Sequence, residues 1–205
     1  MNATNPDKIK LSQNIIIADA DYVSHVMFDL TVNFERMLDR RMPDADLAQW
    51  IIDIALDGGM RQGNNETEVV LVHGKSKHIF EYFTPSDYDT QINNKAFNDP
   101  AFGEFAFNTI AESSVANKQQ IISDLIDICL QHDEVKRLMI VPNAEDDDTM
   151  MQLRHALRNA ADDKSITVFA MDPIAGGNFK QEILGYSLTN ALGITQDEID
   201  RKLKE

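Results

Sequence analysis

The spacing of hydrophobic and polar residues alternates along this chain between two patterns, one typical of buried strands and one typical of helices. Short, continuous apolar runs such as 15–17, 69–72 and 138–141 are typical of strands buried on both faces of a sheet. Longer segments with apolar residues every three or four positions predict helices with one buried stripe. The predicted strands are 13–18, 68–73, 78–83, 102–110 (as an edge strand), 138–141 and 166–171.

The predicted helices lie between these strands. They run from Asp21 to about Arg40, from a cap at Asp44 to Gly58, after Asn117, after the acidic run 145–148, from Phe179 to Leu192, and after Thr195. Asn117 with Gln120, and Thr195 with Glu198, have the spacing of capping boxes. Residues 84–100 are rich in turn formers, and we assign them no fixed shape.

Strands that alternate with helices favour an α/β fold, a three-layer sandwich around a mostly parallel sheet of about five strands. At 205 residues the chain is long enough for one ordinary domain. We assign residues 13–205 to that domain and residues 1–12, which are mostly polar, to a flexible N-terminal arm.

The net charge of −15 narrows the range of partners. An acidic surface repels phosphate backbones, so nucleic acid is disfavoured, and a protein partner or a homo-oligomer fits better. Phe97, Phe102 and Phe105 are candidates for a contact patch, although core burial is the usual place for each. With no secretory signal, no apolar run of about 20 residues and a single cysteine, Cys129, the chain is expected to be cytoplasmic and not to enter a membrane.

Candidate chemistry begins where the first strand ends. Asp19 and Asp21 follow the run 15–17 and are two residues apart, so in strand geometry their side chains leave on the same side. Carboxylates placed in this way bind hard cations such as Mg²⁺ or Mn²⁺. The alternative is that either aspartate is only the N-cap of the next helix.

A second acidic group follows the strand at 138–141. If the two strands are neighbours in a parallel sheet, Asn143, Asp146, Asp147 and Asp148 meet Asp19 and Asp21 at one crevice and complete a metal site. Acidic residues in the first turn of a helix also complement the helix dipole without any metal. Both interpretations stay open at this point.

A third candidate is the glycine-containing loop before the helix expected at 179. Gly176, Gly177 and Asn178, with Lys180 close by, form a possible anion loop, because a helix N-terminus there would present free N–H groups. The alternative is a glycine turn in which Asn178 caps that helix and Gln181 completes the box.

The order of elements resembles the PIN/NYN-like nuclease fold, a Rossmann-like arrangement. In that family a first strand ends in aspartate, and a later strand ends in a small polar group and acids before a helix. The resemblance implies a divalent-metal-dependent phosphodiesterase in which Asp19 or Asp21 is the first acid, and Asn143 with one of Asp146–Asp148 forms the later group.

Two further resemblances compete with this one. The stretch Ile15–Val23 is similar to the first motif of haloacid-dehalogenase-type phosphatases, which implies that Asp19 is the nucleophile and Asp21 the general acid/base. The stretches 17–22, 32–36 and 176–186 resemble a family of uncharacterised bacterial proteins, which implies no activity. A non-catalytic interaction or scaffolding domain is therefore the alternative function, and whether the chain is an enzyme is left open.

Overall fold

The fold is built around one large, mainly parallel sheet. We describe it from a computed structural model, in which residues 11–158, 160–202 and 204 are placed. The strands are β1 (Asn14–Asp19), β2 (Ala45–Asp46), β3 (Asn65–His73), β4 (Phe83–Thr84), β5 (Lys95–Asp99), β6 (Gly103–Ala111), β7 (Arg137–Val141), β8 (Ser165–Ala170) and β9 (Lys180–Ile183). Seven of them form the sheet in the order β5-β6-β3-β1-β7-β8-β9, and β2 pairs separately with β4.

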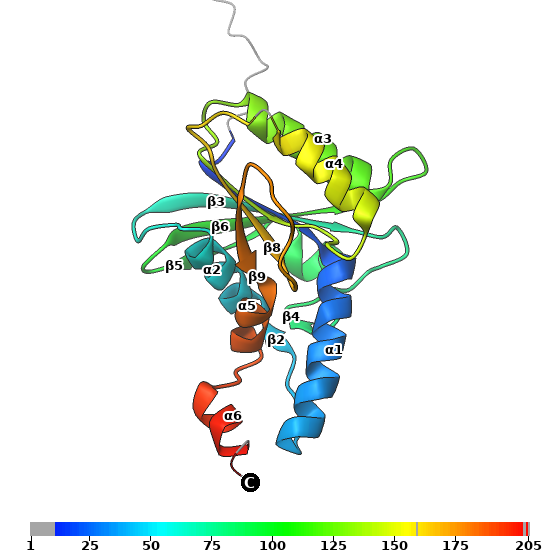
Figure 1. Cartoon of the computed structure of the whole chain (residues 1–205), viewed down its shortest axis with the longest axis vertical. Helices are drawn as coiled ribbons and strands as arrows, with labels where there is room; N and C mark the ends of the chain where they lie inside the picture. Colours follow the sequence, from blue (N-terminus) through cyan, green and yellow to red (C-terminus); the bar gives the residue numbers. More distant parts are fainter. Residues whose placement is uncertain (1–10, 159, 203, 205) are drawn as a thin grey trace, which may run out of the picture.

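Helices cover both faces of this sheet (Figure 1). They are α1 (Ala20–Leu38), α2 (Leu47–Asp57), a π-helical turn η1 (Tyr88–Ile92), α3 (Lys118–Gln131), α4 (Asp147–Leu157), α5 (Leu184–Ala191) and α6 (Gln196–Lys202). In Figure 1, α3 and α4 lie on one face, and α1, α2 and α5 lie on the other. This confirms the predicted three-layer α/β class.

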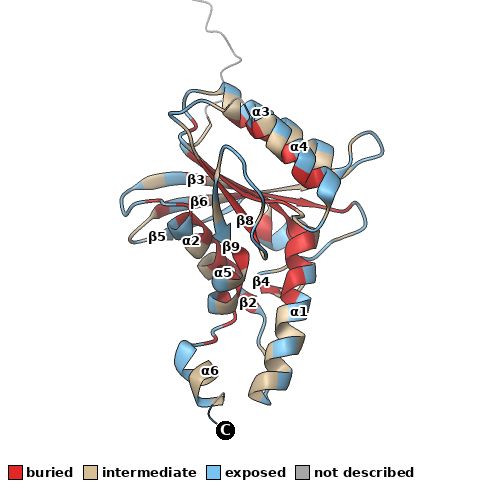
Figure 2. Cartoon of the chain, viewed as in Figure 1, coloured by how far each residue is buried: buried red, intermediate tan, exposed pale blue. Residues whose placement is uncertain are grey.

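Strand β1 divides its side chains between two hydrophobic cores. Ile16 and Ala18 join the core with α1, α2 and α5, whereas Ile15 and Ile17 join the core with α3 and α4. The alternation follows from the pleat, which points successive side chains to opposite faces. Figure 2 shows the central strands buried between the two helical layers.

The carboxyl ends of the central strands lie at one edge of the sheet. β1 pairs in parallel with β3 on one side and with β7 on the other. The chain moves outward from β1 to β3 and β6, and then returns to the other side of β1 as β7. The strand order therefore reverses between β1 and β7, which is the position where open α/β sheets form ligand crevices.

The sheet is wider than the five strands expected, because both edge strands were missed. The segment 84–100 holds η1 and β5, and β5 pairs antiparallel with β6. Phe97 stands opposite Phe105 and their rings stack at 4.9 Å, a stabilising cross-strand pair. Consequently β6 is not the edge strand that was predicted, and these phenylalanines contribute to the core.

The strand predicted at 78–83 is wrong. Tyr82 has a φ of +69°, which interrupts an extended chain, and only Phe83 and Thr84 form β4. Phe80 and Phe83 instead pack on the fully buried Trp50, with ring centroids 5.8 and 5.3 Å from it. Their three-residue spacing therefore reflects an aromatic cluster around Trp50.

Three helix starts also differ from prediction. Asp46 caps α2 in place of Asp44, and α1 begins at Ala20 with Asp19 as its cap, which is one of the two capping alternatives that the sequence left open. The helix expected from Phe179 begins only at Leu184, because Lys180–Ile183 pairs with β8 as strand β9. The N-cap bonds expected at Asn117 and Thr195 form, since Asn117 accepts from the Gln120 N–H and Thr195 from that of Glu198.

The predicted N-terminal arm, residues 1–12, lies outside the described residues except for Leu11 and Ser12, and Leu11 packs partly buried against the α3–α4 core. Within the described residues, none of the helices combines the length and the apolar character needed to cross a membrane.

Candidate functional site

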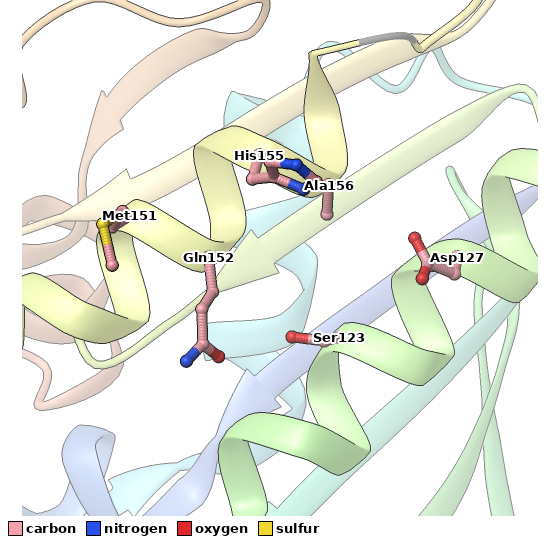
Figure 3. Close-up of a pocket in the computed structure, with 6 residues that line it drawn as sticks. All are labelled: Ser123, Asp127, Met151, Gln152, His155 and Ala156. Atoms are coloured by element: carbon pink, nitrogen blue, oxygen red, sulfur yellow. The ribbon is translucent and has the colours of Figure 1, made fainter.

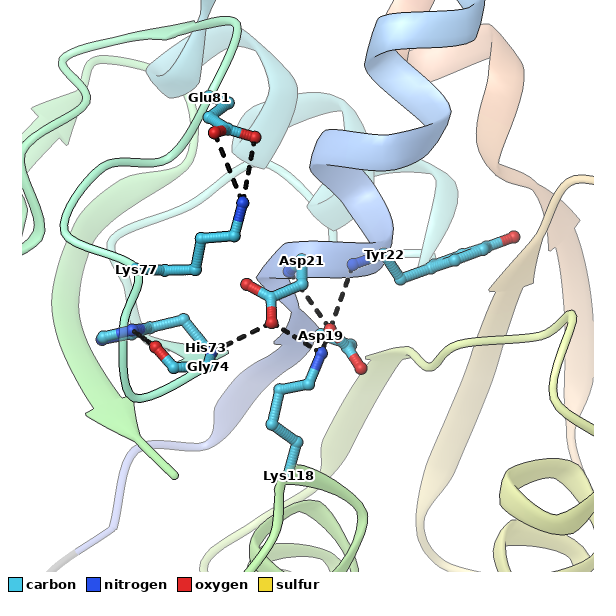
Figure 4. A network of polar contacts seen from close by, with 8 residues as sticks. All are labelled: Asp19, Asp21, Tyr22, His73, Gly74, Lys77, Glu81 and Lys118. Atoms are coloured by element: carbon cyan, nitrogen blue, oxygen red, sulfur yellow. Dashed lines mark hydrogen bonds and ion pairs between the residues drawn. The ribbon is translucent and has the colours of Figure 1, made fainter. Parts of the chain in front are cut away.

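The two aspartates at the end of β1 converge on one lysine. Lys118 Nζ lies 2.7 Å from Asp19 Oδ1 and 2.8 Å from Asp21 Oδ2 (Figure 4). Lys118 is the first residue of α3, which begins at this edge because it connects the carboxyl end of β6 to β7. We call Asp19, Asp21 and Lys118 the Asp–Lys cluster.

Backbone N–H groups hold both carboxylates in place. Asp19 is the N-cap of α1, and its Oδ1 accepts from the N–H groups of Asp21 and Tyr22, each at 3.1 Å. Asp21 Oδ2 accepts from the Gly74 N–H at 3.0 Å. A Cβ at position 74 would stand only 3.0 Å from Asp21 Oδ2, so glycine lets the backbone come this close.

The cluster is partly shielded from water. The side chain of Asp19 is 5% exposed, that of Lys118 20% and that of Asp21 25%. Burial alone would lower the pKa of Lys118, but the charges and hydrogen bonds of Asp19 and Asp21 outweigh it and raise that pKa. Lys118 is therefore an ammonium ion throughout the physiological pH range.

Tyr88 and Tyr22 lie close enough to the cluster for its carboxylate charges to act on their phenols. His73 stacks on Tyr88 at 4.0 Å, and its Nδ1 donates to the Gly74 carbonyl at 3.1 Å. Burial, followed by the charges of Asp21, Asp19 and Glu81, raises the pKa of Tyr88. Burial also raises the pKa of Tyr22 to about 12, with Glu145, Asp172 and Asp19 adding to the rise. Both phenols therefore stay neutral.

The acids after β7 have a different role from those after β1. Asp146 caps α4 and accepts from the Thr149 N–H at 2.8 Å and from the Thr149 hydroxyl, which lowers the pKa of Asp146. Asn143 Oδ1 accepts from the Glu145 N–H at 3.2 Å, which closes the turn. Asp147 and Asp148 lie exposed in the first turn of α4.

The structure brings the two acidic ends to the same edge but not into one metal site. β1 and β7 are neighbours, as predicted, and the charges of both Asp19 and Glu145 act on Tyr22. However, no three His, Cys, Asp or Glu side chains within residues 11–158, 160–202 and 204 are grouped so that they could hold a metal ion. Asp19 and Asp21 are therefore not gathered with Asp146–Asp148 in such a group.

The predicted anion loop loses its physical basis. Gly176, Gly177 and Asn178 lead into strand β9, with Lys180 as its first residue, so the helix that was expected to present its N–H groups to the loop begins later, at Leu184. The Asn178 side chain donates to the Ala160 carbonyl at 3.5 Å and caps no helix.

A surface groove of about 580 Å³ lies between α3 and α4 (Figure 3). Its lining residues are Ser123, Asp127, Met151, Gln152, His155 and Ala156. Serine, histidine and aspartate can form a nucleophilic triad, but no hydrogen bond or ion pair connects these three within the part of the chain that the structure describes. We therefore place no chemistry in this groove.

Sequence reasoning found the two aspartates and missed Lys118 and Gly74. A signal for Lys118 was present, because the capping box at Asn117 fixed the start of its helix. In a parallel sheet, each crossover helix that follows a strand begins at the carboxyl edge. The site of Lys118 therefore followed from the fold class, whereas the approach of Gly74 depends on a loop conformation.

The chain belongs to a family of unknown function, DUF6621, whose family model matches residues 8–199. Neither a curated protein nor a solved structure matches the chain. The match confirms the resemblance to an uncharacterised family, and it covers the whole Asp–Lys cluster.

Proposed function

We propose that the protein is a divalent-metal-dependent hydrolase of phosphate esters, of the phosphodiesterase type, with the Asp–Lys cluster as its active site. One observation carries the proposal. Two carboxylate oxygens from residues two apart point at a single cationic centre, at the position in the sheet where the strand order reverses.

The cluster offers two carboxylates and, among the described residues, no third acidic, histidine or cysteine ligand beside them, so a Mg²⁺ or Mn²⁺ would be held loosely. Magnesium is usually bound through one or two carboxylates, with water and substrate phosphate completing its shell. The Lys118 ammonium serves as a stand-in here, because it places a positive charge in contact with Asp19 Oδ1 and Asp21 Oδ2. When bound, the metal would offset charge on the phosphoryl group and acidify an attacking water.

Each residue of the cluster has a separate role in this proposal. Asp19, fixed by backbone N–H groups and nearly buried, orients the cation. Asp21, which is the more exposed carboxylate, accepts the proton of the attacking water. Lys118 donates to a non-bridging phosphate oxygen and thereby positions the substrate.

A phosphatase with a covalent intermediate is the second candidate, supported by the uneven bonding of Asp19. Its Oδ1 receives three donors, whereas its Oδ2 receives none from the described residues. Oδ2 would form a bond to phosphorus as the ester bond breaks, and protonated Asp21 would give its proton to the leaving oxygen. Water would then hydrolyse the aspartyl phosphate. Against this candidate, α1 begins directly at Ala20, where such phosphatases carry a turn and a hairpin.

The test compares two chromogenic substrates, bis(p-nitrophenyl) phosphate and p-nitrophenyl phosphate, with and without Mn²⁺ or Mg²⁺. Metal-dependent hydrolysis of the diester is the expected result. Hydrolysis of the monoester alone would favour the second candidate.

Matched variants connect that activity to the cluster. Asp21→Asn should lower kcat/KM by about a hundredfold or more, the usual loss when a general base is removed. Asp29→Asn, an exposed aspartate of α1, should leave it unchanged. Equal activity in both variants would place the hydrolysis outside the Asp–Lys cluster, and no hydrolysis of either ester would favour a non-catalytic interaction domain. Either result would overturn the proposal.

A further inference from the structure

Strand β5 leaves one of its edges open. It is an outermost strand of the seven-stranded sheet, and among the described residues it shares a backbone ladder with β6 alone (Figure 1). Alternate N–H and C=O groups of such a strand point away from the sheet and can pair with a further strand. The side chains of Lys95, Ala96 and Asn98 are exposed, and those of Phe97 and Asp99 are half-buried. Solvent, and therefore a partner, can reach this edge.

The sequence of β5 is complementary to itself when one copy runs antiparallel to another. Pairing two copies about Phe97 places Lys95 of each copy opposite Asp99 of the other. The two Phe97 side chains then meet on the two-fold axis. Opposite charges and aromatic rings that face each other across strands stabilise a sheet. A shift by one or two residues in either direction would place Asp99 opposite an uncharged residue, so the charges specify one register.

Both charged side chains are available for this contact. The Lys95 ammonium forms no hydrogen bond or ion pair with the described residues. Asp99 Oδ1 accepts from the N–H groups of Ala101 and Phe102, at 2.8 and 2.9 Å, whereas Oδ2 receives no donor from the described residues. The carboxylate is therefore held in place and still has an oxygen free to pair with a lysine of a second copy.

An apolar pocket of about 190 Å³ lies beside the same strand. Its lining includes residues 95–97 of β5, Leu47 of α2, Ile92 of η1 and Phe107 of β6. Phe97, although stacked on Phe105, remains half-buried. A second copy of β5 placed alongside would cover part of this apolar surface, and its removal from water would favour association.

The opposite edge of the sheet lacks this complementarity. β9 is the outer strand there, and an antiparallel pair of β9 strands about their centre places Lys180 opposite Ile183 and Glu182 opposite Gln181. The charge of Glu182 also acts on Asp57 of α2, so acidic groups gather at this edge. Charge therefore favours β5 over β9 as the contact between two copies.

We propose that the protein forms a homodimer through two antiparallel β5 strands centred on Phe97, which joins the two sheets into one. The contact is isologous, so it occupies both open edges at once and closes at two copies. Each copy carries a net charge of −15, which opposes association at low ionic strength. Because five residues from each copy form a small interface, we expect a dimer that dissociates on dilution. This inference does not depend on the proposed catalytic function.

Sedimentation equilibrium of the full chain at physiological ionic strength tests the dimer. The mass should rise from that of one chain to that of two as the concentration approaches millimolar. Lys95→Glu turns both charge pairs into pairs of like charges, so it should weaken the dimer by about tenfold or more. Lys180→Glu is the matched control, because it makes the same charge change in the first residue of β9. It should weaken the dimer far less.

Three outcomes of this experiment would overturn the inference. They are a wild type that stays monomeric at millimolar concentration, an assembly larger than a dimer, and equal weakening by Lys95→Glu and Lys180→Glu. If Lys95→Glu does not fold, cross-linking of cysteine variants decides.

Cysteine cross-linking tests the register on its own. In the proposed pair Ala96 faces Asn98 of the second copy, whereas the two Ala96 residues are diagonal neighbours, roughly 7–8 Å apart. A disulfide needs Cα atoms within about 7 Å. A mixture of Ala96→Cys and Asn98→Cys proteins, oxidised with Cu(II)-phenanthroline, should therefore cross-link severalfold faster than either protein alone. The wild type is the blank, because its Cys129 is buried. Equal rates in the mixture and the separate proteins, or no cross-linking, would overturn the inference.

Discussion

Two neighbouring strands of this sheet end in acidic residues, and the two ends behave differently. After β1, Asp19 and Asp21 converge on Lys118 and are partly buried. After β7, Asp146 caps α4, and Asp147 and Asp148 face solvent. Acids after a buried strand therefore do not define a site by themselves. The helix start of α3, which comes from elsewhere in the chain, makes the difference.

Removing the N-cap aspartate at each of the two strand ends should give the largest difference in stability between them. Asp19→Ala loses both a helix cap and a partner of Lys118, so we expect a loss of roughly 3 kcal/mol in the free energy of unfolding. Asp146→Ala loses a cap alone and should cost clearly less. Urea unfolding of the two variants measures both losses, and equal losses would show that Lys118 adds nothing to the β1 end.

A smaller effect comes from the close approach at Gly74. Gly74→Ala places a methyl group against Asp21 Oδ2, so we expect a loss of about 1 kcal/mol in the free energy of unfolding. Gly185→Ala is the control. Gly185 lies in helix α5, and a Cβ at this position would meet Met171 only at an ordinary contact distance. That variant should be neutral or slightly stabilising, and destabilisation equal to that of Gly74→Ala would refute the explanation.

The contribution of Asp146, at the β7 end, to the free energy of unfolding should depend on pH. The Thr149 contacts lower the pKa of Asp146 from its ordinary 3.8. Its stabilising contribution is therefore complete above that ordinary value and is lost as the pH falls through the lowered pKa. The stability difference between the wild type and Asp146→Ala should shrink in this acidic range. A difference that stays constant down to pH 2 would contradict the assignment.

The smallest effect concerns the carboxylate of Asp57, the last residue of α2. Partial burial, together with the charges of Glu182 and Asp53, raises the pKa of Asp57. Its ionised form is thus unfavourable at neutral pH, and the penalty disappears as the pH falls through the raised pKa. Asp57→Asn should raise Tm slightly at pH 7 and leave it unchanged near pH 3. A lower Tm at pH 7 would refute this.

The sequence was informative wherever burial alone set the pattern. The runs 15–17, 69–72 and 138–141 lie in the central strands β1, β3 and β7, because strands covered on both faces need continuous apolar residues. These strands were enough to predict the fold class and the shared edge of the two acidic ends. The edge strands β5 and β9 carry polar residues on their open sides, so nothing separated them from loops.

The part of the site that lies next to a buried strand could also be predicted from the local sequence pattern. Asp19 and Asp21 follow a buried strand directly, and local pattern is enough to find them. Lys118 is 99 residues away from Asp19 in the sequence, and its contact depends on how α3 crosses the sheet. The failed anion loop shows the reverse case, because a glycine-rich segment was assigned to a helix start that β9 replaces.

The aromatic cluster around Trp50 places the tryptophan fluorescence of the protein at one position in the core. Trp50 is the one tryptophan in the chain, and it is fully buried against Phe80 and Phe83. Its emission should be blue-shifted in the folded protein and move to the red on unfolding, when water reaches the indole. Every unfolding curve described above can therefore be recorded without a dye.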